Sequence, residues 1–302
     1  MKPEIVKSTL RPMNTTGALP EEVRASARHL LAQVRDRLAL YDTADEAAVL
    51  EIVHQTRVDS KRLCALWQLL RPGLKKSDFR TLERLSRGLA RPLGSSRDAQ
   101  VMQETLAWVG RGLDAGVCAR LQTGLAALLA DEAKAHVSSL PRVMDSLQRL
   151  ETRVLAADLE GLRRRHLRQG LEKACCKGET LAGEALGSYA MTPLHGWRKW
   201  IKLLLYQSGW LLGNQSPEWV SWLKVLGSDL GRLHDLDVLG ERVERARDQF
   251  WQGDMQQLLE RLGQARQEIL HETEEVAARL YTKNGKKRAR QLYRHWADRQ
   301  ED

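Results

Sequence analysis

A short stretch, VHQTRVDSKRL at residues 53–63, places basic side chains at helical spacing. His54, Arg57 and Lys61 stand at offsets of three and seven. At about 100° per residue these positions fall within an arc of roughly 60° on a helix, and Arg62 lies at the edge of that arc. Arginine offers a planar fork to phosphate oxygens, lysine a point charge, and histidine a donor that becomes cationic beside a polyanion. The stretch therefore predicts an anion-binding helix face.

The same spacing returns in the second half of the chain, in LHGWRKWIKLL at residues 194–204. One stripe of this helix carries His195, Arg198, Lys199 and Lys202. Like charges at these offsets repel each other by a few tenths of a kcal/mol, and neither stripe contains an acid that relieves the repulsion. A water-facing stripe is the simpler interpretation for one helix, but the repetition favours a bound anion. Cations at one-turn spacing fit a linear chain of negative charges better than one small anion.

A second pair of matching stretches follows the basic ones. LGSSRDAQVM at residues 93–102 aligns with LGRLHDLDVL at residues 230–239 and shares Leu, Gly, Asp and Val with it. The alignment also pairs charged positions, Arg97 with His234 and Asp98 with Asp235. We take Arg97 and His234 as further anion-binding candidates. Because an acid beside a polyanion is unfavourable, we expect the two aspartates to pair with Arg or His neighbours and fix their rotamers. A plain salt bridge between helices is the alternative.

The starts of the two halves match more weakly. A shift of 140 residues places Arg24 and Arg28 over Arg164 and Arg168. These four arginines are weaker binding candidates.

The composition favours an all-α fold, since Leu, Ala, Arg, Glu and Gln dominate and β-branched residues and proline are sparse. Pro92 and Pro141 are expected to bend the third and fourth helices of the first half. The helical period covers residues 21–40, 45–71, 78–110, 114–158, 160–187, 193–213, 217–249 and 254–300, and Asn284-Gly285 interrupts the last range.

Four helices followed by four helices predict two tandem, repeat-related four-helix bundles with a basic groove or channel between them. The first bundle is expected over residues 20–158 and the second over residues 159–302. Residues 1–19 have no helical period, so we expect a flexible N-terminal tail.

The net charge of the chain indicates the class of ligand, and its cysteines indicate the cellular compartment. Lys and Arg number 48 against 39 acids, and the resulting charge of +9 favours polyanions. Cys64, Cys118, Cys175 and Cys176 form no CxxC pair. Residues 1–20 lack the apolar core of a signal peptide, and no apolar run approaches the ~20 residues of a membrane span. We expect a reduced, cytoplasmic protein without a membrane partner.

At these motifs the sequence resembles the CHAD family, the conserved-histidine α-helical domain. In that family a helix with His-x-x-Arg and further basic residues precedes a Leu-Gly-x-x-Arg-Asp-type motif, and the pair recurs in the second half. The resemblance covers roughly residues 20–300. It implies two four-helix bundles that bind inorganic polyphosphate on a basic surface between them, and association with polyphosphate granules and their proteins. The implied ligand contacts are His54, Arg57, Lys61, Arg62, His195, Arg198, Lys199 and Lys202.

The motifs of several enzyme classes are missing, so we expect binding without catalysis, cofactor or metal. HDLD at residues 234–237 resembles the His-Asp dyad of metal phosphohydrolases, but the first copy has Arg97, which does not ligate metals. The sequence has no GxxxxGK, HExxH or GxSxG. It also lacks the ExExK motif of the triphosphate-tunnel domain that is often fused to CHAD domains.

Nucleic-acid binding, or a scaffold that recruits partners to a polyanion, is the alternative function. A basic cluster near the C-terminus could serve either role: Lys283, Lys286, Lys287, Arg288, Arg290 and Arg294. Nucleic-acid readers usually add exposed aromatic platforms or a recognition helix. The nine tryptophans fall mostly at the spacing of an apolar helix face, which makes nucleic acid the less favoured partner.

Overall fold

The structure is a computed structural model that describes residues 7–134, 140–213 and 215–300, and these ranges contain α-helices and short 3₁₀ turns but no strand. This confirms the predicted all-α class. The helices are α1 (Leu19–Leu38), α2 (Glu46–Leu70), α3 (Lys76–Gly88), α4 (Gly94–Val109), α5 (Ala115–Lys134), α6 (Leu140–Ala156), α7 (Arg164–Ser188), α8 (Met191–Leu212), α9 (Glu218–Arg245), α10 (Gln252–Leu280) and α11 (Gly285–Ala297). No helix in the described ranges is both long enough and apolar enough to cross a membrane.

At Pro92 and Pro141, where bends within long helices were expected, the structure has separate helices instead. A 3₁₀ turn at Arg91–Leu93 separates α3 from α4, because the proline at its centre cannot continue an α-helix. Pro141 lies in the first turn of α6, where a missing N–H costs nothing, and residues 135–139 before this helix lie outside the described residues. Asn284 starts α11 as its N-cap, and its side chain accepts a hydrogen bond from Lys287 N at 3.0 Å.

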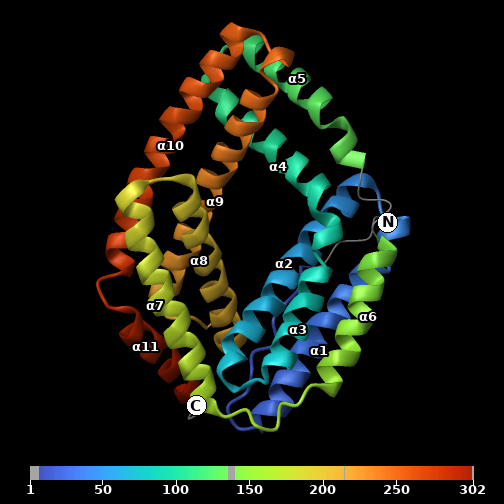
Figure 1. Ribbon diagram of the computed structural model, residues 1–302, viewed down its shortest axis with the longest axis vertical. Coiled ribbons are helices and arrows are strands. Elements are labelled where there is room, and N and C mark those ends of the chain that lie inside the picture. The colour runs from blue at the N-terminus through green and yellow to red at the C-terminus, as the bar shows by residue number, and fades with distance from the viewer. Residues whose placement is uncertain (1–6, 135–139, 214, 301–302) are drawn as a thin grey trace.

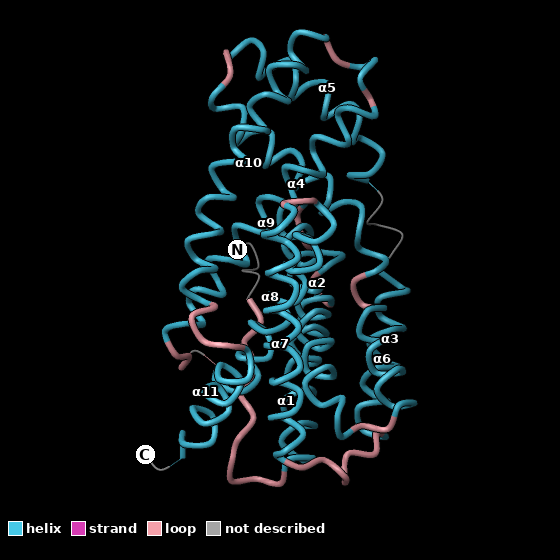
Figure 2. The backbone as a smooth tube through the Cα atoms, turned by 60° about the vertical axis from the view of Figure 1, so that its left-hand side comes forward, coloured by secondary structure: helices cyan, strands magenta, loops and turns pink. Residues whose placement is uncertain are grey.

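In the view of Figure 1 the helices are arranged around a central gap, and Figure 2 shows the same helices turned by 60°. On one side α1, α2, α3 and α6 pack together, and on the other α7 packs on α8 and α11. The sides meet where α2 packs on α7 and α8. At the upper end α4 and α5 from the first half of the chain contact α10 from the second half, and α4 also packs on α9. Because helices from both halves close the ring together, the division into two tandem bundles remains a prediction.

The chain before α1 is packed against the helices rather than loose, which corrects the expected flexible tail for residues 7–18. Met13 is buried, and its backbone N–H donates to Trp210 O at 2.9 Å. Its carbonyl accepts a hydrogen bond from the indole N–H of Trp296, also at 2.9 Å. The backbone N–H and C=O groups of a segment outside helices have no partners within the segment, so they can pair with distant groups such as a buried indole N–H. A segment held in this way needs no helical periodicity in its sequence. Residues 1–6 lie outside the described residues.

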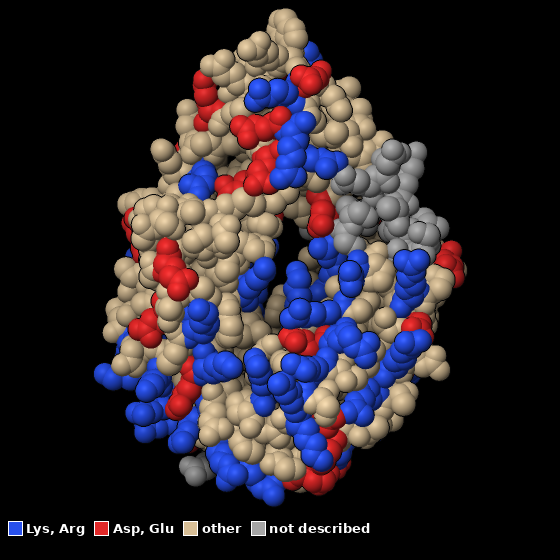
Figure 3. Space-filling view, in the orientation of Figure 1, with Lys and Arg blue, Asp and Glu red and all other residues tan. Residues whose placement is uncertain are grey.

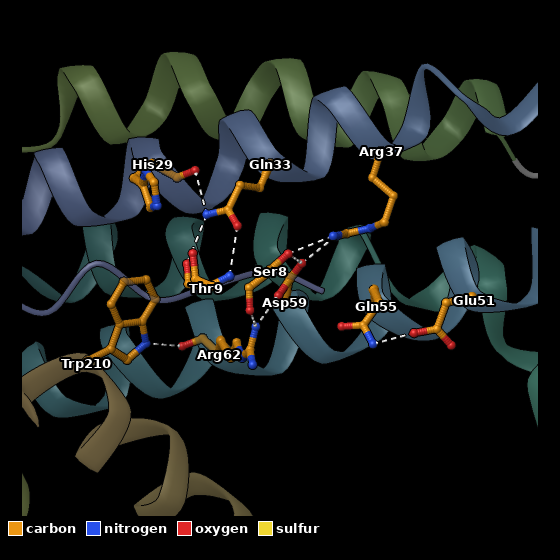
Figure 4. Close-up of polar contacts among 10 residues, drawn as sticks. All are labelled: Ser8, Thr9, His29, Gln33, Arg37, Glu51, Gln55, Asp59, Arg62 and Trp210. Carbon is orange, nitrogen blue, oxygen red and sulfur yellow. Dashed lines mark hydrogen bonds and ion pairs between the residues drawn. The ribbon is translucent and has the colours of Figure 1, made fainter. Parts of the chain in front are cut away.

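A buried ionic network ties this N-terminal segment to α1 and α2 (Figure 4). Asp59 on α2 is completely buried, and one of its carboxylate oxygens forms an ion pair with Arg37 of α1. Ser8 Oγ donates to the same oxygen at 2.6 Å and accepts from Arg37 Nη1 at 2.7 Å. Arg62 Nη1 donates to the other carboxylate oxygen at 2.9 Å and to the carbonyl of Ser8 at 2.9 Å. Two guanidinium groups therefore neutralise one buried carboxylate.

We predict that Asp59→Ala lowers the free energy of unfolding by about 3 kcal/mol, because it leaves the buried Arg37 guanidinium without a counter-charge. Urea unfolding followed by circular dichroism measures the change. Asp36→Ala removes an exposed carboxylate from α1 and is the matched control, with an expected change within about 0.5 kcal/mol. Equal effects of the two substitutions would contradict a structural role for the network.

Candidate functional site

The helices that carry the two basic stripes, α2 and α8, are packed against each other. The side chain of Asp45 caps the start of α2 by accepting from Ala48 N at 2.9 Å. Buried polar groups of α8 then bond directly to the backbone of α2. The indole N–H of Trp210 donates to Arg62 O at 2.7 Å, and Gln207 Nε2 donates to Ala65 O at 3.3 Å. These bonds fix the two basic stripes relative to one another.

Four cations from the two helices converge, and we call them the cation cluster: Arg57, Lys61, Arg198 and Lys202. Their proximity acts on the amine of Lys61, whose pKa is lowered to about 8. Burial among neighbouring groups is the largest cause, followed by the charges of Arg57 on its own helix and of Arg198 and Lys202 on α8. The side chain of Lys61 as a whole is nevertheless exposed, so solvent screens part of this repulsion.

Asp98 on α4 provides a counter-charge for the first stripe. Its Oδ1 accepts from Arg57 Nη2 at 3.0 Å, and Arg57 Nη1 also donates to the carbonyl of Leu93 at 3.3 Å. The negative charge of Asp98 also raises the pKa of Lys61 in opposition to the larger lowering effects. Asp98 is thus paired with a basic neighbour from another helix, an arrangement that both the expected orienting role and a plain salt bridge between helices would give.

Asp235 occupies the corresponding position on α9. Its charge raises the pKa of Lys202, although burial and Arg198 lower that pKa overall. The neighbouring acid Asp237 has a different partner, because it accepts from Arg266 Nε at 3.0 Å. The part of the chain that the structure describes contains no group of three or more His, Cys, Asp or Glu side chains arranged to hold a metal ion.

Two glycines on α9 lie beside the basic side chains of α8, and the sequence analysis did not single them out. A Cβ atom at Gly231 would lie 3.7 Å from Arg198 Nε, and one at Gly227 would lie 3.6 Å from Lys202 Cε, which are ordinary van der Waals distances. The side chains of Arg198 and Lys202 therefore pass close to the backbone of α9.

The two histidines of the second half lie together. The ring centroids of His195 and His234 are 4.4 Å apart, with a tilt of 33° between the planes. Burial, followed by Arg198, His195, Lys199 and Lys61, lowers the pKa of His234 to about 4. The pKa of His195 is also lowered, by burial and then by Lys199 and Arg198. Within the described residues, neither Nδ1 atom has a hydrogen-bond partner. His234 is therefore neutral at physiological pH in the free protein.

The other predicted contacts have varied surroundings. Lys199 is exposed, and His54 is partly buried on α2. Arg62 is held by Asp59 and by the carbonyl of Ser8, so its guanidinium is already engaged by the fold. Arg97 lies in α4, and its side chain is outside the described residues.

The four weaker candidates lie on α1 and α7. Arg24 forms ion pairs with Glu21 at 2.9 Å and with Glu160 at 3.3 Å. Arg28 is exposed. Arg164 donates to a backbone carbonyl of the N-terminal segment, and Arg168 Nε lies 3.9 Å from a carboxylate oxygen of Glu172. Three of the four thus have partners in the fold.

The surface around the cation cluster is open. Figure 3 shows an opening through the molecule near the middle of the face in view, with Lys and Arg side chains on both sides of its lower rim. The helices around this opening in Figure 1 are α2, α4, α8 and α9, which carry the cation cluster and its two aspartates. We call this space the basic channel.

In the C-terminal basic cluster, Arg288 has a structural role. It is buried, its Nε donates to Leu280 O at 3.1 Å, and its guanidinium lies over the rings of Trp219 and Trp222 at 5.4 and 5.7 Å. Lys286, Lys287, Arg290 and Arg294 are exposed on α11, and Lys283 is exposed just before that helix. The cluster is therefore only partly available to a ligand.

We predict that Lys61→Met raises the melting temperature at pH 7, because it removes a cation that burial and three like charges destabilise. The folded-state pKa, about 8, lies below the unfolded value of 10.5, so the parent gains stability as the pH rises between them. The difference in melting temperature between the variant and the parent should therefore be smaller at pH 10 than at pH 7. Thermal unfolding at both pH values tests this, with Lys224→Met, an exposed position on α9, as the control. A constant difference at the two pH values would contradict the assignment.

The sequence profile of the CHAD domain family matches residues 24–244. No curated protein matches the sequence. The crystal structure of the CHAD domain from the plant Ricinus communis superposes with a TM-score of 0.66 at 19% identity, covering 93% of this chain and 97% of that one. PptA from Streptomyces chartreusis gives a TM-score of 0.61 at 16% identity, covering 94% of this chain and 100% of the other. These two proteins share the fold, and because the profile match spans most of the sequence, the chain belongs to the CHAD domain family.

Proposed function

We propose that this protein binds inorganic polyphosphate in the basic channel. The observation that carries the proposal is the convergence of cations from α2 and α8 on Lys61, which lowers the pKa of its amine to about 8. Such a cluster is unfavourable in the free protein, and a bound polyanion would relieve the repulsion while forming charge-assisted hydrogen bonds. The motifs through which the sequence resembles the CHAD family are the ones that carry these cations.

A linear phosphate polymer fits the channel better than one small anion. From His54 to Lys61, and from His195 to Lys202, each stripe extends roughly 10 Å along its helix at 1.5 Å per residue. The two stripes can contact several successive phosphates, and the opening lets a chain longer than the stripes leave at either end (Figure 3).

The proposed activity is binding without chemical conversion of the polymer, and it would bring the protein to polyphosphate granules in the cell. The basic side chains neutralise and orient phosphate oxygens. Incubation with long-chain polyphosphate followed by gel analysis of chain length tests the absence of cleavage. Localisation of a fluorescent fusion relative to stained granules tests the targeting.

Nucleic acid is the competing ligand, and the aromatic residues argue against it. Trp67, Trp197, Trp210 and Trp296 are fully buried and cannot stack on bases. Trp251 is highly exposed, but it lies beside Arg120, which is engaged by Asp254. Displacement of labelled polyphosphate by unlabelled polyphosphate, single-stranded RNA, heparin or ATP at fixed salt distinguishes these ligands. Equal displacement by RNA and polyphosphate would indicate a general polyanion binder.

We predict that Arg57→Gln combined with Lys61→Gln weakens polyphosphate binding roughly a hundredfold, since each charge-assisted hydrogen bond contributes about 1.5–3 kcal/mol. Isothermal titration at fixed salt measures the change, and the melting temperature without ligand should not fall. Lys173→Gln combined with Lys177→Gln removes the same charge from exposed positions on α7 and should bind like the parent. A loss of stability with affinity retained would show that the channel residues are structural.

We also predict that affinity rises as the pH is lowered from 7 to 5. The pKa of His234 is about 4 in the free protein, and a bound polyanion raises it, so protonation becomes coupled to binding above the free value. His234→Gln should show a smaller rise. His29→Gln, an exposed position on α1, should retain the rise of the parent. Identical pH profiles for the parent and the His234 variant would exclude this histidine from the ligand site.

A further inference from the structure

A second row of basic residues lies outside the channel, in a groove between α3 and α6. Arg80, Arg84 and Arg87 stand at offsets of four and seven on one face of α3, and Arg91 follows in the 3₁₀ turn. Arg149 faces them from α6 across a groove of about 680 Å³. We call this feature the arginine groove. All five of its cations are arginines, the residue best suited to bidentate contact with phosphate.

The acids in the groove balance only part of this charge. Glu83 pairs with Arg87 at 2.9 Å, and Asp145 pairs with Arg149 at 3.0 Å. For the other three arginines, Arg80, Arg84 and Arg91, no ion pair is recorded within the described part of the chain, and all three are exposed. The groove therefore keeps an excess of positive charge that faces solvent and is open to a ligand.

The arginine groove is connected to the basic channel along α2. Cys64 and Gln68 follow Lys61 at offsets of three and seven, so all three lie on one stripe of that helix. Gln68 Nε2 donates to Glu83 Oε1 at 2.7 Å, and Arg87 Nη2 donates to the same oxygen at 2.9 Å. The helix stripe that begins at Lys61 therefore ends at Gln68, which contacts the first ion pair of the groove. Figure 3 agrees, because Lys and Arg side chains extend from the rim of the opening over the region of α3 and α6.

We propose that the arginine groove is a second binding segment for the same polymer, which takes up polyphosphate where it leaves the basic channel. The proposal rests on the proposed function. A chain long enough to occupy both segments forms contacts that a short oligophosphate in the channel cannot reach. Occupation of the channel holds the emerging chain near the groove at a high effective concentration, so even weak exposed contacts increase the affinity. The groove therefore makes the protein selective for long chains.

The test compares two phosphate polymers on the same variants. Arg84→Gln combined with Arg91→Gln should weaken binding of long-chain polyphosphate roughly tenfold, because two phosphate contacts are lost at exposed positions. Tripolyphosphate, which is too short to leave the channel, should bind this variant as it binds the parent. These two arginines are chosen because their removal leaves no acid of a recorded ion pair exposed to the ligand. Arg84→Lys with Arg91→Lys keeps the charge and should retain most of the affinity.

The control removes the same charge elsewhere. Lys173 and Lys177 are exposed on α7, away from both surfaces, and Lys173→Gln with Lys177→Gln should leave long-chain affinity unchanged. An equal loss in this control would show a general charge effect and overturn the proposal. So would unchanged long-chain affinity in the groove variant, or an equal loss of both polymers. Failure of the parent to bind either polymer would instead refute the proposed function itself.

Discussion

The close packing of α8 on α2 is the constraint on which the rest of the site depends. Gln207 and Trp210 donate hydrogen bonds from α8 directly to carbonyls of α2. Because a buried donor that loses its acceptor is costly, these bonds hold the helices in one register. The register brings Lys61 near Arg198 and Lys202, an arrangement that charge repulsion alone would disperse. The stability of the helix contact thus maintains an unfavourable electrostatic site.

The aspartates near the basic stripes have two different roles, one in the stability of the fold and one in the candidate binding site. Asp59 lies under the basic stripe, where it binds Arg37 and Arg62 and fixes the N-terminal segment. Asp98 and Asp235 lie on the other walls, each near one stripe, and offset only part of its charge. Full neutralisation would remove the attraction for an anion, whereas no acid at all would leave the basic side chains unoriented. The observed balance keeps the side chains in place and leaves positive charge for a ligand.

The sequence predicted the helices and the basic stripes well, because both follow from local periodicity. Proline and glycine positions also located the breaks between α3 and α4 and before α11. The N-terminal segment could not be predicted, since Met13 pairs through its backbone with tryptophans far along the chain. The engagement of Arg62 by Asp59 was missed for a similar reason. In the sequence, Asp59 and Arg62 have the spacing of an ordinary ion pair on the surface of a helix. Only the structure shows that Asp59 is buried.

The types of cation differ between the channel and the groove. In the channel, burial and like charges lower the pKa values of Lys61, Lys202, His195 and His234. These groups lose protons more readily than free side chains, so loss of a proton can relieve part of the repulsion, whereas a bound polyanion would favour their charged forms. The two arginines of the cation cluster cannot respond in this way, and Arg57 is paired with Asp98. The five cations of the groove are all arginines, and solvent screens the repulsion between them. The channel therefore combines adjustable and permanent cations, whereas the groove has only permanent ones, so the electrostatic response to pH should differ between the two surfaces.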